Sequence, residues 1–561
     1  MKKVLFQLLA LLCILSCSED LTDYYTRLDE RSAANEALKK KNDDLSSAND
    51  ALAKRNADIA AMNARLKLEG QELFEKLLSL EASTRMSTPK LLSFEFVTAD
   101  NSSLSQNVVG EIVGDSIIDC WIPKMMSDKF LIPRYKFAGT LVTIDGMEAE
   151  SGVTMFDFGK PVILTVHTSV KSVSYKLYVH AYTGLPIMWI YTVGGAPIVS
   201  RDEYINGNMI LTEDSKTRGP GDVLRADLQI KGRGNYNWNQ SPKKSYRLKF
   251  TEKVSLFGEH KDKSWVLIPN YADKSALRNH IALYLGKMSN LEYTSSSHFV
   301  ELILNGQYNG MYQVCEKMKI SNHRVAVGDD GFLLEVTMRA AQKGLIYFYV
   351  NHMTNPISIE DPDVTEGDDN YNYAKAHVAN ADAVLYSDYF KDPTRGWRAY
   401  FDMDSFVEWY LVNEIAHNTD AAMLHSCFMH FKRGGKIAMG PIWDFDLGFG
   451  NTDYFDRGPY DFWIKKSDWI SRMFNDPVFV AKVKERYDYF YSRKADIMRV
   501  IDETAVYLKW SAYENENRWH TFYQYVWPNY EFWGSYYNEV QSVKEWLNSR
   551  MDWLKVEFDK M

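Results

Sequence analysis

Cysteine is scarce in this chain of 561 residues, which contains only five. Cys13 and Cys17 lie near the N-terminus, and Cys120, Cys315 and Cys427 are far apart in the sequence. This spacing excludes a disulfide framework and the paired cysteines of common zinc sites. Beyond the first fifteen residues, no apolar run is long enough to cross a membrane.

An excess of positive charge is also missing. The chain has 65 Lys and Arg against 74 Asp and Glu, which gives a formal net charge of −9. A basic surface is the usual mark of a nucleic-acid-binding protein, so we expect no nucleic-acid partner. The length exceeds what one compact core holds, and therefore we expect several domains.

The N-terminus has the features of a secretory leader. Two lysines precede an apolar stretch over residues 4–15, which is too short to span a bilayer. Ile14-Leu15-Ser16-Cys17 then resembles a bacterial lipobox. We expect residues 1–16 to be a lipoprotein signal peptide and a lipid on Cys17 to attach the protein to the outer membrane, with the chain periplasmic or surface-exposed. An ordinary signal peptide with an incidental cysteine is the alternative.

A seven-residue repeat follows the leader. Apolar residues recur at every seventh position, and asparagine recurs three residues before most of them: Leu38, Leu45, Leu52, Ile59, Leu66, Leu73 and Leu80, with Asn35, Asn42, Asn49, Asn56 and Asn63. This is a heptad with apolar d and asparagine a positions, which predicts a coiled coil. We expect residues 17–88 to hold the anchor and a stalk that forms a homo-oligomer through residues 28–82. Gly70 is a weak point, a dimer is favoured with a trimer open, and the alternative is a solvated single helix.

Short strands replace the helical period after the stalk. Tyr175, Leu177 and Val179 alternate with polar neighbours, and glycines separate the strands. About ninety residues with this pattern predict an immunoglobulin-like β-sandwich over residues 89–184. We interpret it as a spacer, with an adhesive module as the alternative.

Three aspartates flank a predicted hairpin in the C-terminal half. Asp420 follows a helix that we expect to start at Asp404, the hairpin runs over residues 428–439, and Asp444 and Asp446 come directly after it. The hairpin would bring the three carboxylates together, where they repel one another unless a cation or proton compensates. Oxygen ligands of this kind favour Mg²⁺ or Ca²⁺. The alternatives are a turn cap for Asp420 and a structural Ca²⁺ site for the other two.

A glycine-rich turn precedes these aspartates in the sequence. The strand over residues 228–232 runs into Arg233 and Gly234, and the next strand carries Lys243 and Lys244 at its start. A glycine turn lets backbone amides approach an anion, and a lysine on the following strand can complement phosphate charge. A solvated basic face is the alternative.

Together these motifs resemble the spore-coat CotH kinase family. The resemblance covers residues 185–561 and rests on four motifs: Arg233-Gly234-Asn235 with Trp238 and Pro242-Lys243-Lys244-Ser245-Tyr246-Arg247-Leu248, Asn309-Gly310-Met311-Tyr312, Glu316-Lys317, and Trp443-Asp444-Phe445-Asp446. It implies an α+β multidomain chain that ends in a diverged protein-kinase-like α+β domain. Some members of the family transfer the γ-phosphate of ATP to secreted proteins, and others are surface invasins.

The resemblance also implies roles for single residues. Asp420 would be the catalytic aspartate, Asp444 and Asp446 would hold Mg²⁺ or another divalent cation, and His425 is a further candidate ligand, with packing as its alternative. Nucleotide binding would involve Arg233, Gly234, Lys244 with Lys243 as its rival, and Glu316. One departure concerns the second metal: many relatives carry His-Asn where this chain has His425-Ser426, and serine is a poorer Mg²⁺ ligand.

Two functions are consistent with these features. The first is a lipid-anchored kinase that uses ATP and Mg²⁺ to phosphorylate hydroxyls of extracytoplasmic proteins. The second is a non-catalytic oligomeric surface adhesin, or a glycan- or protein-binding lipoprotein, in which the kinase-like domain is a degenerate scaffold that binds a surface ligand. The helical tail after residue 470 is expected to be structural.

Overall fold

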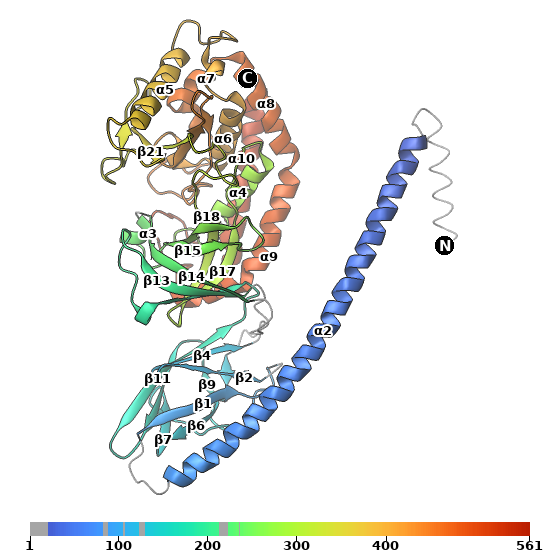
Figure 1. Cartoon of the computed structure of the whole chain (residues 1–561), viewed down its shortest axis with the longest axis vertical. Helices are drawn as coiled ribbons and strands as arrows, with labels where there is room; N and C mark the ends of the chain where they lie inside the picture. Colours follow the sequence, from blue (N-terminus) through green and yellow to red (C-terminus); the bar gives the residue numbers. More distant parts are fainter. Residues whose placement is uncertain (1–20, 82–87, 105–106, 123–128, 213–222, 235) are drawn as a thin grey trace. The chain divides into compact units, whose positions relative to one another are not determined.

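A computed structural model describes residues 21–81, 88–104, 107–122, 129–212, 223–234 and 236–561 (Figure 1). The predicted signal peptide and the lipid site at Cys17 lie outside these residues. The chain forms two compact units, Met1–Thr88 and Pro89–Met561. The structure therefore has a mixed α+β composition, with one long N-terminal helix and several β-sheets.

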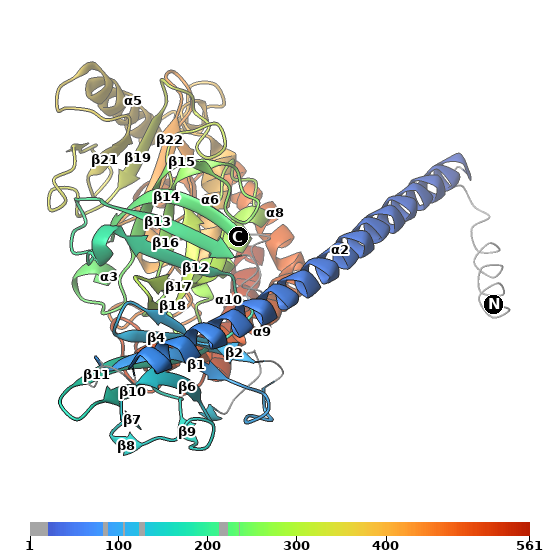
Figure 2. The ribbon, with the colours of Figure 1, turned by 60° about the horizontal axis from the view of Figure 1, so that its bottom comes forward.

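The first unit contains helix α2 (Leu21–Glu81), which is 61 residues long and continues through Gly70 without a break (Figure 2). The apolar heptad positions Leu38, Leu45, Leu52, Leu66 and Leu73 expose between 52% and 65% of their surface. Such a sustained apolar stripe is costly to leave in water. None of the helices within the described ranges is both long and apolar enough to cross a membrane.

The second unit begins with two sheets that share one hydrophobic core. They have the strand orders β2-β1-β6 and β3-β4-β11-β10-β7-β8, and a short β5-β9 pair accompanies them. The strands are β1 (Lys90–Phe96), β2 (Val108–Val109), β3 (Glu111–Val113), β4 (Ile117–Ile122), β5 (Phe130–Leu131), β6 (Arg134–Ala138), β7 (Leu141–Ile144), β8 (Met147–Glu148), β9 (Phe156–Asp157), β10 (Val162–His167) and β11 (Ser172–Ala181). The predicted alternation is confirmed, because Tyr175, Leu177 and Val179 are buried in that core. The immunoglobulin-like assignment stays a prediction.

A closed seven-stranded barrel comes next, in the order β12-β13-β14-β15-β16-β18-β17. Its strands are β12 (Ile187–Thr192), β13 (Ile205–Thr212), β14 (Val223–Gly232), β15 (Tyr246–Val254), β16 (Asp262–Ile268), β17 (His298–Leu304) and β18 (Gln307–Glu316). Because successive side chains of a strand alternate between faces, Ile230, Tyr246 and Leu248 fill the barrel core. The residues between them, such as Lys231 and Arg247, therefore lie on the outer face.

A five-stranded sheet follows the barrel, in the order β20-β21-β19-β22-β23. Its strands are β19 (Phe332–Val336), β20 (Tyr347–Phe348), β21 (Ile357–Asp361), β22 (Cys427–Phe431) and β23 (Ala438–Met439). The α-helices of the second unit are α3 (Tyr236–Asn239), α4 (Arg278–Met288), α5 (Asp369–Leu385), α6 (Met403–Ala416), α7 (Asp468–Met473), α8 (Pro477–Ser492), α9 (Lys494–Trp519) and α10 (Tyr536–Asp559).

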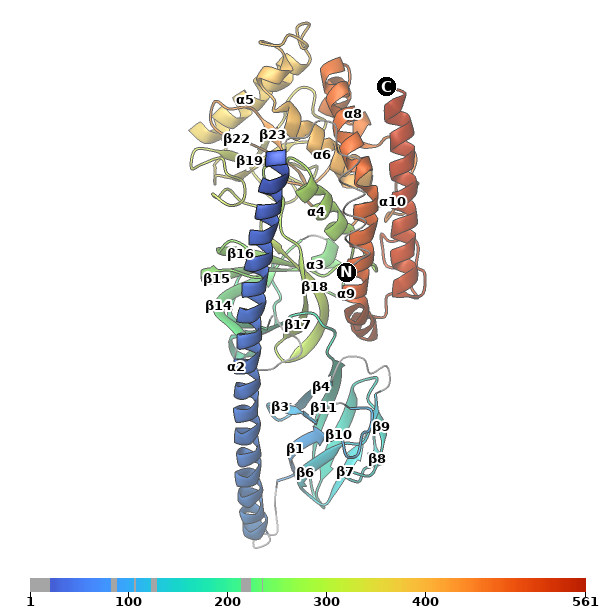
Figure 3. The same cartoon turned by 90° about the vertical axis from the view of Figure 1, so that its right-hand side faces the viewer.

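The C-terminal helices α8, α9 and α10 pack side by side (Figure 3). They also hold the rest of the unit together, since α9 packs on β18 and α10 on α6. Arg550 on α10 donates to the carboxylate of Glu414 on α6 at 2.6 Å, and both side chains are fully buried. Removing one partner of such a buried pair leaves an uncompensated charge, which costs roughly 3–5 kcal/mol. The tail is thus helical and packed, in agreement with the prediction from the sequence.

Candidate functional site

The three aspartates, Asp420, Asp444 and Asp446, lie in the segments that follow helix α6 and the β22–β23 hairpin. Asp402 caps α6 by accepting a hydrogen bond from the amide of Ser405, so the expected start at Asp404 was two residues late. The helix ends at Ala416, and a 3₁₀ turn, η3 (Thr419–Ala421), carries Asp420. The predicted hairpin is confirmed, because β22 and β23 pair in antiparallel fashion.

The backbone around these aspartates is strained. His417, Met423, Ser426, Asp444 and Phe449 all have positive φ angles between 45° and 66°. Non-glycine residues in this region cost about 1–3 kcal/mol each and persist only where the surrounding structure holds them. Such residues cluster at functional sites, so the segment after α6 is a candidate on conformation alone.

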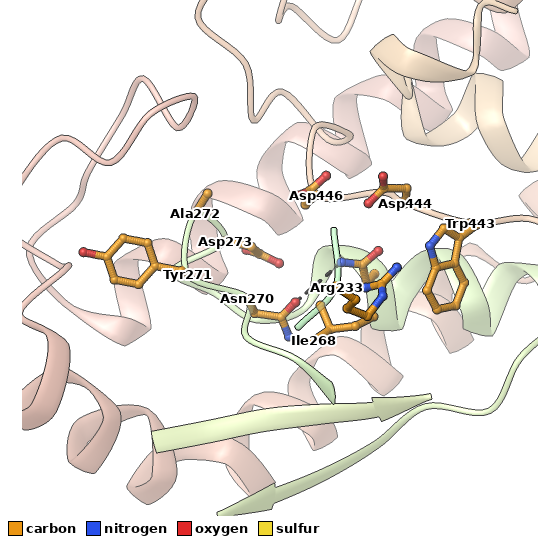
Figure 4. Close-up of a pocket in the computed structure, with 10 residues that line it drawn as sticks. Arg233, Ile268, Asn270, Tyr271, Ala272, Asp273, Trp443, Asp444 and Asp446 are labelled. Carbon is orange, nitrogen blue, oxygen red and sulfur yellow. Dashed lines mark hydrogen bonds between the residues drawn. The ribbon is translucent and has the colours of Figure 1, made fainter. Parts of the chain in front are cut away.

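A small cavity lies beside two of the aspartates. Figure 4 shows Asp444 and Asp446 on one loop, with Arg233 and Asp273 facing them from two others. Its lining comprises Arg233, Ile268, Asn270, Tyr271, Ala272, Asp273, Asn279, Trp443, Asp444 and Asp446. The guanidinium of Arg233 lies 5.6 Å from the ring centre of Trp443, within cation–π range. The cavity volume of about 20 Å³ has room for one water molecule or ion.

The carboxyl groups of this region affect one another. Burial, and then the charge of Asp444, raises the pKa of Asp420 to about 7. Burial raises the pKa of Asp446 well above its ordinary value, and the charges of Asp444, Asp420 and Asp273 add to this. These mutual effects on pKa place Asp420, Asp444 and Asp446 near one another, as the hairpin predicted. Asp420, however, does not line the cavity.

Glu335 on β19 belongs to the same group and was not predicted as a site residue. Burial raises its pKa to about 7, and the charges of Glu360 and Asp444 act in the same direction. One of its oxygens accepts a hydrogen bond from the amide of Ser426 at 3.2 Å. The sequence contains no motif for this residue, because strand pairing between β19 and β22 is what brings it to the hairpin. Asp273, at the cavity, was also not predicted, because it lies between β16 and α4, far in the sequence from the other aspartates.

The two candidate phosphate-binding lysines point elsewhere. The ammonium group of Lys243 is buried and donates to the carbonyls of Pro269 and Met311, at 2.7 and 2.5 Å, and to Asn515 at 2.8 Å. That of Lys244 donates to the carbonyl of Trp238 at 2.6 Å. Neither lysine lines the cavity, and protein acceptors hold both.

Glu316 and Gly234 do not line the cavity either. The carboxylate of Glu316 accepts from Tyr293 and from the amide of Ser296, both at 3.2 Å, and pairs with Arg324 at 3.4 Å. Gly234 has a φ of 78° and open space around it, as a glycine turn requires. Their binding roles stay predictions.

Within the ranges that the structure describes, no group of three or more His, Cys, Asp and Glu side chains is placed to hold a metal ion. His425 contacts the hydroxyl of Thr337 at 3.2 Å, and burial lowers its pKa to about 4. Magnesium in phosphoryl-transfer sites, however, takes only one or two carboxylates and completes its shell with water and substrate phosphates. Asp444 and Asp446, which line one ion-sized cavity, fit that requirement.

Comparisons with known proteins agree with the motifs. The model of the family described as CotH kinase protein matches residues 229–554, which is more than half of the chain. No curated protein matches this chain. Similar solved structures include a DUF4623 family protein from Bacteroides eggerthii, with 9% identity and a TM-score of 0.14, covering 33% of this chain and 58% of that one. A proposed glycoside hydrolase from Bacteroides thetaiotaomicron has 13% identity and a TM-score of 0.15, covering 51% and 86%.

This chain thus spans 58% of the length of the first of these structures. At such low TM-scores, neither structure supports a statement about fold or activity. The family match covers the barrel strands from β14 onward, the cavity, all three aspartates and most of α10. The chain therefore belongs to the CotH kinase protein family.

Proposed function

We propose that this protein is a kinase that transfers the γ-phosphoryl group of ATP to hydroxyl groups of extracytoplasmic proteins. The observation that carries the proposal is the pKa of Asp420, which burial and the charge of Asp444 raise to about 7. A carboxyl group with this pKa is suited to accept a proton at neutral pH, because its ionised form is both populated and basic.

Asp420 would accept the proton of the substrate hydroxyl. The hydroxyl oxygen forms a bond to the γ-phosphorus, the bond from that phosphorus to the β,γ-bridging oxygen breaks, and ADP leaves with the electron pair. The products are a phosphorylated protein, ADP and the proton on Asp420. Kinases use an aspartate in this way to orient the hydroxyl and receive its proton.

Asp444 and Asp446 would hold the Mg²⁺ that accompanies ATP. When bound, the ion neutralises charge on the phosphates. The two carboxylates face Arg233 across the cavity (Figure 4), so acidic and basic groups border the same space. The raised pKa of Asp446 means that cation binding there competes with a proton.

The finer fold assignments belong to the same proposal. We infer that the barrel and the five-stranded sheet with its helices correspond to the two lobes of a diverged kinase-like domain, since the site residues come from both. The sheets of residues 89–181 would be an immunoglobulin-like spacer. The exposed leucine stripe of α2 supports a coiled-coil stalk that associates with other copies. The leader motif supports attachment by lipid at Cys17, on the periplasmic or outer face of the outer membrane.

An oligomeric adhesin with a degenerate kinase-like scaffold is the second candidate. Two observations favour it: serine stands at position 426, and the cavity beside Asp444 and Asp446 has room for only one water molecule or ion. Binding of ATP would thus require the segments around the cavity to separate.

Nucleotide binding and transfer distinguish the two candidates. For the kinase, Mg²⁺-dependent binding of ATP, measured by calorimetry, is lost in Asp444→Ala and kept in Asp420→Asn, whereas phosphoryl transfer is lost in both. For the adhesin, the wild-type chain neither binds ATP with Mg²⁺ nor transfers phosphate. Far-UV circular dichroism of each variant provides the control for folding.

A further inference from the structure

The outer face of the barrel carries a group of basic side chains outside the three-aspartate region. Lys231 on β14 is directly opposite Arg247 on β15, and Arg247 is followed across the sheet by Val266 on β16 and Cys315 on β18. Lys317 directly follows β18, its amide donates to the carbonyl of Ser264 on β16 at 3.4 Å, and the charge of Arg247 acts on it. Arg233, which lines the cavity, extends the row from the end of β14.

Arg247 lies at the centre of this group and lacks a partner. The structure shows no hydrogen bond or ion pair of its side chain with any described residue, and its Nε is buried and unsatisfied. An unpaired buried donor on a charged group is costly, and native structures rarely retain one without a ligand, water or ion to satisfy it.

The positive side chains around Arg247 also favour the binding of an anion. Burial, and then the charge of Arg247, lowers the pKa of Lys317 to about 8. The charge of Arg247 also contributes to the lowered pKa of Lys231 and of Arg233. Within the described ranges, the ammonium of Lys317 has no hydrogen-bonding partner, and Glu360 and Asp361 act on it only through their charge.

The basic group adjoins the acidic one. The charge of Glu360 affects the pKa of both Lys317 and Glu335. The charge of Asp444 also affects the pKa of Glu335. Arg233 connects the two groups, because it lines the cavity with Asp444 and Asp446, and the charge of Arg247 also acts on it. A ligand with several negative charges, bound to a divalent cation, is complementary to both groups at once.

We propose that Arg247 and Lys317 form the subsite that binds the polyphosphate tail of the nucleotide, in place of Lys243 and Lys244. The inference rests on the proposed function for the identity of the ligand. Arginine suits this position because its planar guanidinium donates to phosphate oxygens in pairs, and it keeps its charge when desolvated. Lys243 and Lys244 instead donate to protein carbonyls.

Binding of inorganic tripolyphosphate to the mature chain tests the subsite without any transfer reaction. The titration is made by calorimetry in the absence of divalent cations, and melting curves verify that each variant is folded. We expect the dissociation constant to rise about tenfold or more in Arg247→Met and in Lys317→Met, because each loses a charge-assisted hydrogen bond. Lys249→Met is the matched control, since Lys249 lies on the same strand and face but is exposed, and it should change the constant less than about twofold.

The outcomes separate this subsite from the proposed function. Folded Arg247→Met and Lys317→Met chains that bind tripolyphosphate as well as the wild type would overturn the subsite, and so would a wild-type chain that does not bind it. If binding depends on Arg247 but no phosphoryl transfer occurs with ATP and Mg²⁺, the subsite stands and the kinase function fails. If the chain is active, Arg247→Lys should raise the KM for ATP less than Arg247→Met does.

Discussion

The hydroxyl of Ser426 donates a hydrogen bond to a carboxylate oxygen of Asp444 over 3.4 Å. The amide of the same serine donates to Glu335. Ser426 therefore contacts two carboxylates at once, although serine is a weaker Mg²⁺ ligand than asparagine.

Replacing this serine with asparagine should strengthen cation binding. Ser426 has a φ of 54°, and asparagine tolerates this left-handed conformation better than most residues. We expect Ser426→Asn to fold normally and to give a larger increase in melting temperature with Mg²⁺ than the wild type does. Ser426→Ala is the control, and an equal Mg²⁺ response in all three proteins would show that position 426 takes no part in cation binding.

The stability of the metal-free protein should fall between about pH 4 and pH 7. The unfolded chain ionises Asp420 near the ordinary aspartate pKa of 3.8, whereas the folded chain does so at about 7. The folded state therefore binds the proton of Asp420 more tightly than the unfolded chain does. As a result, this group's contribution to the free energy of unfolding is fully present below pH 4 and is lost as the pH rises through 7. Asp420→Asn keeps a neutral side chain, so it should be more stable than the wild type at pH 8, on the order of 1–3 kcal/mol.

Thermal melts with EDTA at pH 4 and pH 8 measure this difference. The variant and the wild type should have similar melting temperatures at pH 4, and the variant should melt higher at pH 8. A variant that is less stable at pH 8 would mean that the ionised carboxylate of Asp420 is stabilised by its surroundings.

Lys243 should matter for stability more than for phosphate binding. Its ammonium satisfies two carbonyls and the amide oxygen of Asn515 in a buried position. Lys243→Met leaves these acceptors unpaired, and each unsatisfied buried group costs about 1–3 kcal/mol. We expect the melting temperature to fall by several degrees, and a smaller fall for Lys244→Met, whose lysine has one acceptor. A Lys243→Met chain that melts normally but no longer binds ATP would restore Lys243 as the phosphate ligand.

Local patterns in the sequence predicted the elements that depend on neighbouring residues. The hairpin before Asp444 and the long helix α2 both follow from nearby side chains. The closure of seven strands into a barrel did not, because β12 pairs with β17 more than a hundred residues away. The sequence also did not predict the hydrogen-bond acceptors of Lys243 and Lys244, because these are carbonyl groups that only the folded chain brings close to each lysine.

The stalk should determine the oligomeric state. Replacing Leu45 and Leu52 with aspartate puts charge into the d positions of the predicted coiled coil, where burial is unfavourable. Light scattering of the mature chain should give an oligomer for the wild type and a monomer for this variant. Aspartate at Ser47 and Lys54, which are f positions of the same heptads, should leave the mass unchanged. A monomeric wild type would contradict the stalk as an association element.

Transfer of labelled phosphate tests the kinase function most directly. The chain is incubated with γ-labelled ATP and Mg²⁺ in the presence of a mixture of extracytoplasmic proteins, and acid-stable label on protein is measured for the wild type and for Asp420→Asn. We expect label with the wild type, and none above background with Asp420→Asn even though that variant still binds ATP. Equal labelling by both proteins, or none by the wild type, would refute the proposed transfer.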